Sequence, residues 1–369
     1  MEFLRNTWYV AMWGQDLDPG QIEQREICGD LIAIYRKHDG TVAAVADQCS
    51  HRFAPLSRGK LCGDHLQCPY HGLQFADDGR CVVNPHGSGR ITPQLHVRSY
   101  PVVERHTLLW IWMGDADVAD PDLIPDFSYL DEGAPGTFSK RDWMIVDVDY
   151  RLMADNLLDL SHANFLHEGL LGHAGMNDAD VEIREEIEAS GATTLYVTRT
   201  VRGVEPPHLF DLMYRNDAQP IDTWAEMRWN APGCLRNHAG VTDPGGARED
   251  GLIVIGSHLL TPIDERRMMY HICAVQLGAA PPVTDDEVAE TLSRLRRFAF
   301  EEQDLPMVEA QQRAYDRAGG ADALKPVMLG IDSGPLRARR LLDGMIAAER
   351  AATVDVRPRR ERLEPVAGQ

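Results

Sequence analysis

The pattern of apolar and polar positions divides the chain into two unlike parts. Up to about Gly114, short apolar runs alternate with turn-forming residues, as at 31–35, 42–45 and 108–112. Residues 37–40 and 76–79 each end in Asp-Gly, a dipeptide typical of tight turns between antiparallel strands. This first part is therefore predicted to be an all-β unit.

The second part has longer runs and two helical patterns. Asp, Ala and Pro dominate from Asp115 to Pro125, which predicts a linker. Strand-like runs follow at 143–152, 194–198, 223–229, 252–260 and 268–277. Their connections are too short for parallel crossovers, so we expect an antiparallel sheet. Residues 285 to about 302 and 335 to about 352 have the apolar faces of amphipathic helices.

These elements predict an α+β chain with two domains. Residues 1–115 form an all-β domain, and residues 116–352 form a domain in which helices flank an antiparallel sheet, an arrangement of helix-grip type. Residues 353–369 are predicted to be a tail, because the sequence there is basic and lacks an apolar pattern.

Composition narrows the choice of partners. The chain of 369 residues has a formal charge of −20, and so acidic a surface disfavours nucleic acid and anionic membranes as partners. No signal-like segment and no run of about 18 apolar residues occurs, so we expect a cytoplasmic protein. The seven cysteines are odd in number and scattered, which fits reduced thiols in a reducing compartment.

Two Cys/His pairs stand close together in the first part. Cys49 and His51 are separated by one residue, and Cys68 and His71 by two. Prolines and glycines around both pairs place them in loops between strand-like runs. Two thiolates and two imidazoles suit a Rieske [2Fe-2S] cluster, in which the thiolates hold one iron and the imidazoles hold the other. The alternative is a structural zinc ion with the same four ligands.

A second group of polar residues occupies 155–167. Helical spacing places Asn156, Asp159 and His162 on one face. His162 and His167 are five residues apart, about 140° out of line on a regular helix, so a shared metal requires the backbone to loosen between them. Two imidazoles and one carboxylate would suit ferrous iron with open positions for dioxygen. The alternative is a polar helix face with two solvated histidines.

A candidate for the carboxylate ligand precedes Pro306 in the sequence. Proline removes a backbone donor and interrupts the helical pattern that begins at Asp285, which could turn the carboxylate of Asp304 inward. The alternative is that Asp304 caps the next helical segment, a common role for aspartate.

The sequence around these residues resembles the Rieske non-haem iron oxygenases, in particular oxygenase components of the vanillate and dicamba O-demethylase type. The resemblance lies in residues 6–10, 51–56 and 69–73, and in the pattern Asn-x-x-Asp-x-x-His-x-x-x-x-His that ends at His167. Ala54 and Tyr70 stand where respiratory Rieske proteins carry two further cysteines, which implies a low-potential cluster fed by a reductase.

The resemblance implies roles for these residues. The [2Fe-2S] cluster would be held by Cys49, His51, Cys68 and His71. A mononuclear Fe(II) would be held by His162, His167 and Asp304, with Asp304 preferred to its neighbouring glutamates as third ligand. Asp159 and Asn156 would assist catalysis. Asp159 would carry electrons from His71 of one subunit to His162 of the next within a homotrimer. Its carboxylate would also fix the tautomer of the His162 ring.

The resemblance also implies the reaction. A small aromatic substrate would lose an alkyl group by O₂-dependent O-demethylation with release of an aldehyde, and Asn237, His258 and Leu295 match pocket positions. N-dealkylation of an anilide and ring hydroxylation are alternatives, and a plain Rieske electron carrier would need only the first 115 residues. No flavin or nicotinamide motif is visible, so a separate ferredoxin and an NAD(P)H-dependent reductase would deliver electrons.

Overall fold

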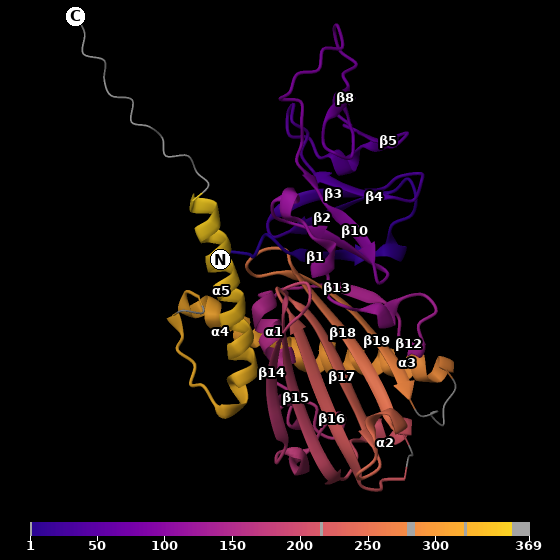
Figure 1. Cartoon of the computed structure of the whole chain (residues 1–369), viewed down its shortest axis with the longest axis vertical. Helices are drawn as coiled ribbons and strands as arrows, with labels where there is room; N and C mark the ends of the chain where they lie inside the picture. The colour runs from indigo at the N-terminus through magenta and orange to yellow at the C-terminus, as the bar shows by residue number, and fades with distance from the viewer. Residues whose placement is uncertain (1, 215–216, 279–284, 321–322, 356–369) are drawn as a thin grey trace, which may run out of the picture.

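The computed structural model describes residues 2–214, 217–278, 285–320 and 323–355 (Figure 1). Residues 2–114, all described, form three small antiparallel sheets, which confirms the predicted all-β unit. The first contains β1 (Trp8–Trp13), β11 (Leu108–Trp112) and β10 (Val102–Arg105). The second contains β2 (Ile22–Ile27), β3 (Asp30–Arg36), β4 (Val42–Ala46) and β9 (Ser99–Tyr100). The third contains β5 (Lys60–Cys62), β6 (His65–Gln67), β7 (Gln74–Phe75) and β8 (Cys81–Val83).

The two loops that carry the Cys/His pairs are built on the same turn. In each loop the cysteine amide donates to the carbonyl five residues on, at 2.9 Å from Cys49 and 2.8 Å from Cys68. The amide four residues on returns a bond to the cysteine carbonyl, and that residue is left-handed: Phe53 at φ 58° and Gly72 at φ 72°. The matched turns bring the two pairs together at the end of the all-β unit that is remote from the large sheet (Figure 1).

The large sheet of the second part is antiparallel, as predicted. Within the described residues seven of its strands follow the order β12-β19-β18-β17-β16-β15-β14, and β13 pairs with β19 beside β12. The strands are β12 (Thr137–Phe138), β13 (Asp142–Val146), β14 (Asp180–Ile187), β15 (Thr193–Val204), β16 (Ile221–Asn230), β17 (Cys234–Thr242), β18 (Leu252–Pro262) and β19 (Met268–Gly278).

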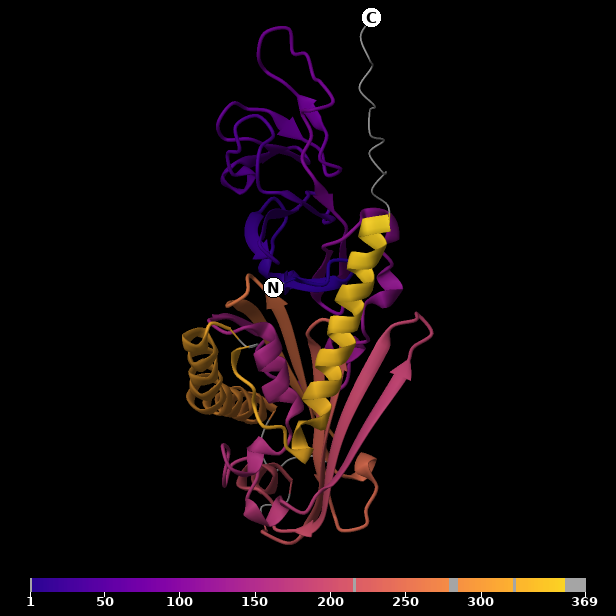
Figure 2. The same ribbon diagram turned by 90° about the vertical axis from the view of Figure 1, so that its left-hand side faces the viewer.

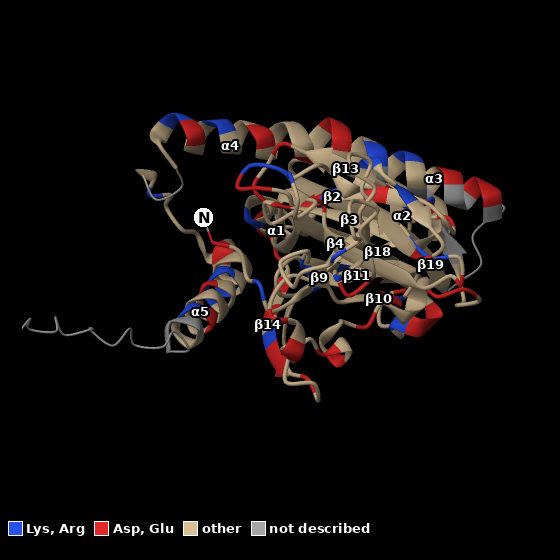
Figure 3. Cartoon of the chain, turned by 90° about the horizontal axis from the view of Figure 1, so that it is seen from above, with Lys and Arg blue, Asp and Glu red and all other residues tan. Residues whose placement is uncertain are grey.

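Helices cover one face of this sheet. They are α1 (Tyr150–Leu158), α2 (His208–Tyr214), α3 (Asp285–Arg297), a π-helical segment (Phe298–Asp304), α4 (Leu305–Ala318) and α5 (Ser333–Asp355). Apolar residues of α1, α4 and α5 share one buried core with β15 to β19. Acidic and basic residues are interspersed along α3, α4 and α5 (Figure 3). The flanked antiparallel sheet confirms the predicted α+β class.

Helix α5 also ties the end of the described chain to its beginning. It runs beside α1 and reaches the N-terminal part (Figure 2). There the Glu349 carboxylate accepts from the amides of Arg5, at 2.8 Å, and Asn6, at 2.5 Å. The predicted last helix, 335–352, is therefore slightly longer in the structure, and residues 356–369 of the predicted tail lie outside the described residues.

Two local predictions were wrong. The strand predicted for 143–152 ends at Val146, because Asp149 caps α1 by accepting from the amide of Arg151 at 2.9 Å. The predicted linker 115–125 is packed against the protein. Its carbonyl at Asp120 accepts from the Trp8 indole at 2.7 Å, and the side chain of Ile124 is buried.

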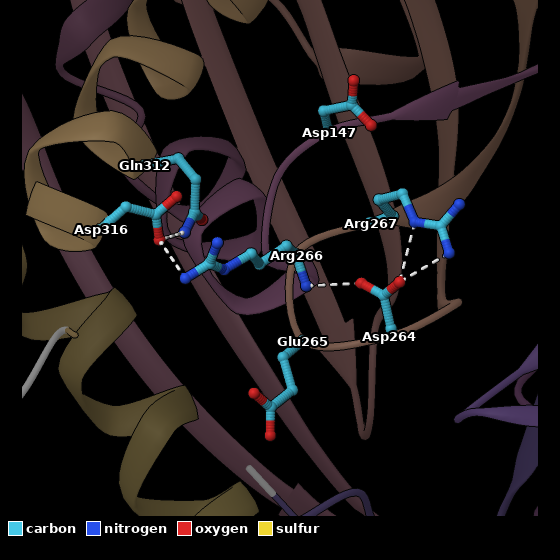
Figure 4. Close-up of a pocket in the computed structure, with 7 residues that line it drawn as sticks. All are labelled: Asp147, Asp264, Glu265, Arg266, Arg267, Gln312 and Asp316. Atoms are coloured by element: carbon cyan, nitrogen blue, oxygen red, sulfur yellow. Dashed lines mark hydrogen bonds and ion pairs between the residues drawn. The ribbon is translucent and has the colours of Figure 1, made fainter. Parts of the chain in front are cut away.

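The β18–β19 turn joins the two parts of the chain. The amides of Cys28 and Gly29 donate to the carbonyls of Pro262, at 2.8 Å, and Ile263, at 2.7 Å. A charged cleft of about 640 Å³ lies between this turn and α4, and its arginines are paired with carboxylates, Arg266 with Asp316 and Arg267 with Asp264 (Figure 4). The first of these pairs links the turn to α4.

No helix among the described residues combines the length and the apolar character that a membrane crossing requires.

Candidate metal centres and substrate cavity

The structure brings the four predicted cluster residues together. The side chains of Cys49 and Cys68 are buried and interact with each other. The rings of His51 and His71 lie with their centroids 4.6 Å apart, nearer the surface. Burial raises the pKa of Cys49 to about 11 in the absence of metal, an effect that the neighbouring thiol reinforces.

These four side chains do not converge on one ion. Among the described residues, no three of these four side chains belong to a group whose ligand atoms all lie within 4.8 Å of one another. A tetrahedral zinc ion needs all four ligand atoms much closer than that. A thiol pair beside a separate imidazole pair instead matches two irons, each held by one pair.

A second set of ligands does converge. The ligand atoms of His162, His167 and Asp304 all lie within 4.8 Å of one another. The Nε2 atoms of His162 and His167 are 3.4 Å and 3.3 Å from Oδ1 of Asp304. Helix α1 ends at Leu158, and a 3₁₀ turn at His162–Asn164 follows. The backbone thus loosens as a shared metal requires, although His162 is not on the helix itself.

Each histidine is held through its other ring nitrogen. Nδ1 of His162 is hydrogen bonded to the backbone carbonyl of Asp159, and Nδ1 of His167 lies 2.7 Å from the side-chain oxygen of Gln303. The bond to Nδ1 of His162 thus comes from the backbone of Asp159 and not from its carboxylate. That carboxylate instead accepts from the amide, at 3.0 Å, and the hydroxyl, at 2.5 Å, of Ser161.

Asp304 stands at the end of the π-helical segment, directed inward. Its side chain makes no capping hydrogen bond, which removes the alternative role as a helix cap. Burial opposes ionisation of the carboxyl group, but the interactions with His162 and His167 dominate and hold its pKa below the ordinary value. Asn156 adds a further bond, from Nδ2 to Oδ1 of Asp304 at 3.2 Å. The carboxylate is thus ionised and oriented, as a metal ligand must be.

A cavity of about 260 Å³ opens beside these three side chains. Its lining is mostly apolar and comes from the sheet, from α2 and from the α3–π-helix segment. All six residues predicted for the metal and the substrate border it: His162, His167, Asp304, Asn237, His258 and Leu295. The three residues predicted as substrate contacts therefore lie in one space with the converging ligands.

Strands β17 and β18 supply the polar wall of the cavity. The side-chain oxygen of Asn237 is buried and has no hydrogen-bond partner among the described residues. His258 stacks on Tyr270 and bonds to its hydroxyl through Nδ1. Gly256 lies between Asn237 and His258, and a Cβ at this position would approach Nε2 of His258 to 2.9 Å. A glycine is needed at this position for the imidazole to lie where it does.

Sequence reasoning missed three residues of this site. Tyr270 and Phe300 line the cavity with ring centroids 4.5 Å apart, and Gln303 holds His167. The signal for Gln303 was its place directly before Asp304. The position of Tyr270 depends on the pairing of β18 with β19, where it lies opposite Leu260, and no motif marks it.

Comparisons with known proteins agree with this geometry. The model of the Rieske [2Fe-2S] domain family matches residues 7–101, and that of the vanillate O-demethylase oxygenase C-terminal domain matches residues 146–348. The oxygenase component of chloroacetanilide N-alkylformylase from Rhizorhabdus wittichii is 37% identical over 94% of this chain and 97% of its own length. The oxygenase component of dicamba O-demethylase from Stenotrophomonas maltophilia is 37% identical over 95% of this chain and 100% of its own.

A solved structure gives the same result. The crystal structure of dicamba monooxygenase with non-haem iron and dicamba superposes with a TM-score of 0.79 at 34% identity, covering 95% of this chain and 100% of that one. An N-terminal Rieske domain followed by this type of cavity domain defines the class of Rieske oxygenases. The chain belongs to that family, among the oxygenase components of the dicamba O-demethylase, vanillate O-demethylase and chloroacetanilide N-alkylformylase group. It is therefore an oxidoreductase that uses dioxygen, with a Rieske [2Fe-2S] cluster, and the zinc alternative was wrong.

Proposed function

We propose that the chain is the oxygenase component of a multicomponent monooxygenase that removes a methyl group from oxygen on a small aromatic substrate. Cys49, His51, Cys68 and His71 hold the [2Fe-2S] cluster, and His162, His167 and Asp304 hold a mononuclear Fe(II). When bound, the cluster supplies single electrons and the mononuclear iron activates dioxygen. The residues fit both groups, because the tip offers two paired ligand sets and the second site offers two imidazoles and a carboxylate.

One observation carries the proposal: the converging ligands form part of the wall of a mostly apolar cavity. A volume of about 260 Å³ suits a substituted aromatic ring. Asn237 and His258 present the polar groups that fix its orientation, and Leu295 and Phe300 limit its shape. This arrangement holds an alkyl substituent of the ring beside the iron ligands and among mostly apolar side chains.

The substrate chemistry follows from hydroxylation of the carbon next to the heteroatom. A methyl aryl ether, dioxygen, two electrons and two protons give a hemiacetal and water, and the hemiacetal collapses to a phenol and formaldehyde. A ferredoxin and an NAD(P)H-dependent reductase deliver the electrons, because neither of the two family matches in this chain is a flavin or nicotinamide domain. All seven cysteines lie among the described residues and none of them forms a disulfide, which fits a cytoplasmic enzyme.

We further propose a homotrimer in which electrons pass between subunits, from His71 of one subunit through Asp159 to His162 of the next. Two surface features support this. Phe53 and Tyr70, 68% and 59% exposed, flank the cluster histidines. A hollow of about 270 Å³ adjoins Asp159 and is bordered by the exposed side chains of Phe165 and Val181. Apolar groups on both surfaces are what a subunit contact requires.

A product assay tests the proposed function. The purified chain, a ferredoxin, a reductase and NAD(P)H are incubated with a panel of methoxylated benzoates and anisoles under air. Formaldehyde and a phenol in equal amounts are the expected products. A cis-diol would show ring dihydroxylation instead, and failure to oxidise any substrate while the cluster is reduced and reoxidised would overturn the proposal.

N-dealkylation is the second candidate, because the chloroacetanilide N-alkylformylase component is as similar to this chain, at 37% identity, as the dicamba O-demethylase component. It needs the same hydroxylation next to a heteroatom. Adding N-alkyl anilides to the panel distinguishes the two, since the organic products are then an anilide or amine and an aldehyde.

A further inference from the structure

Gln303 lies in the π-helical segment, and its side chain extends to the buried His167. Its side-chain oxygen lies 2.7 Å from Nδ1 of His167, whose side chain is almost wholly buried. His162 is held differently, through the backbone carbonyl of Asp159. Of the two histidine contacts, the one to His167 is therefore the one that a side-chain substitution can remove.

The contact sets which ring nitrogen of His167 is free. A neutral imidazole donates from one nitrogen and accepts at the other. If Nδ1–H donates to the Gln303 oxygen, the lone pair of Nε2 points toward Asp304, whose Oδ1 is 3.3 Å away. Partners of this kind fix the tautomer and the ring orientation of metal-ligating histidines.

The π-helical segment explains how two successive residues can serve one site. In a regular α-helix neighbouring side chains point about 100° apart. Residues 298–304 form wider π-helical turns, and within them Gln303 contacts His167 while Asp304 faces both histidines. Segments of this kind occur often at functional sites.

We propose that Gln303 is a positioning residue for the mononuclear iron, which it serves by holding His167 in the tautomer and orientation that present Nε2 to the metal. The proposal rests on the proposed function, since it takes the three converging residues as the iron ligands. Gln303 itself does not touch the metal, and an acceptor atom at its position is all that the role requires.

Metal affinity tests the proposal without recourse to turnover. Mononuclear iron is removed with a chelator while the Rieske cluster is retained, and the dissociation constants for Fe(II) and for Co(II), as a spectroscopic probe, are measured. We expect Gln303→Leu to weaken binding about 10- to 100-fold with an unchanged Rieske spectrum. Gln303→Glu keeps an acceptor oxygen and should bind within about threefold of the wild type. Gln311→Leu, on the exposed face of α4, is the matched control.

Two results would overturn the proposal. Binding by Gln303→Leu within about twofold of the wild type would show that the contact does not matter. Equal weakening in Gln303→Leu and Gln303→Glu would show that the side chain only packs the segment. A wild type that binds neither metal at this site would instead refute the proposed function, so the two failures are distinguishable.

Discussion

The two candidate metal sites are built in opposite ways. At the Rieske tip, two backbone turns of one design present a buried thiol pair and a half-exposed imidazole pair. At the second site, side chains from separate parts of the chain meet at the wall of a mostly apolar cavity and are held by neighbours such as Gln303 and Asn156. An electron-transfer centre has to be reached by a partner, whereas a centre that handles dioxygen and substrate has to exclude water.

The largest expected effect separates the two sites. His167→Ala should lower turnover by about a thousandfold or more, because loss of a ligand removes several kcal/mol of metal-based stabilisation. The visible and EPR spectra of the cluster should not change. Cys68→Ala should do the reverse, removing the cluster spectrum while Fe(II) still binds at the second site. Cys81→Ala is the control, and loss of both centres in either variant would contradict independent sites.

Asp159→Asn probes the connection between the sites. Both metals should remain bound, but turnover should fall about 100-fold, because the proposed electron path runs through this carboxylate. Stopped-flow reoxidation of the reduced cluster in the presence of substrate reports the step directly. The exposed Asp178→Asn is the matched control. Normal turnover in Asp159→Asn would remove this carboxylate from the electron path.

Gly256→Ala sharpens the description of the cavity. The new Cβ would lie 2.9 Å from Nε2 of His258, so the imidazole must rotate away. We expect KM to rise about tenfold with a smaller change in kcat, since substrate orientation rather than the iron is disturbed. In Gly330→Ala nothing lies within 4 Å of the new Cβ, and that variant should behave as the wild type. An unchanged KM would exclude His258 as a substrate contact.

The smallest expected effect concerns the joint between the two parts of the chain. His271 is wholly buried between Trp13 and Trp143, and neither ring nitrogen has a partner among the described residues. Burial, with the charge of Arg25, lowers its pKa to about 3 from the ordinary 6.5.

Between those two pH values only the unfolded chain protonates this imidazole, so stability falls as the pH is lowered, by at most about 1.4 kcal/mol per unit. Thermal melts of His271→Phe should therefore depend less on pH from 6.5 to 4 than melts of the wild type. The exposed His208→Phe is the control, and equal slopes in all three proteins would show that His271 is not responsible.

Much of the fold was predictable because strong apolar patterns mark it. The strands around 194–198, 223–229, 252–260 and 268–277 were found from sequence, whereas β14 was not. Strand β14 lies at the edge of the sheet and every one of its residues is exposed, so no buried pattern reveals it. The strand predicted to run to Leu152 failed because the helix signal at Asp149 is a single capping residue.

The residues of the candidate site differ in how far the sequence alone could identify them. The metal-type residues form short motifs, so spacing and chemistry pointed to them directly. Tyr270, Phe300 and Gln303 reach the site through strand register and π-helical geometry, which depend on contacts between distant segments. The bond that holds His162 was not predicted for a similar reason, since it comes from the backbone carbonyl of Asp159 and a sequence pattern shows only side chains.

The π-helical segment makes the oxygen-handling centre depend on the number of residues between 298 and 304, and not only on which residues they are. Shortening the segment by one amino acid would let it close into ordinary α-helical turns and would change the directions in which Gln303 and Asp304 point relative to the two histidines. Insertions and deletions in this segment are thus a way for related chains to lose catalysis while they keep every metal-ligand residue.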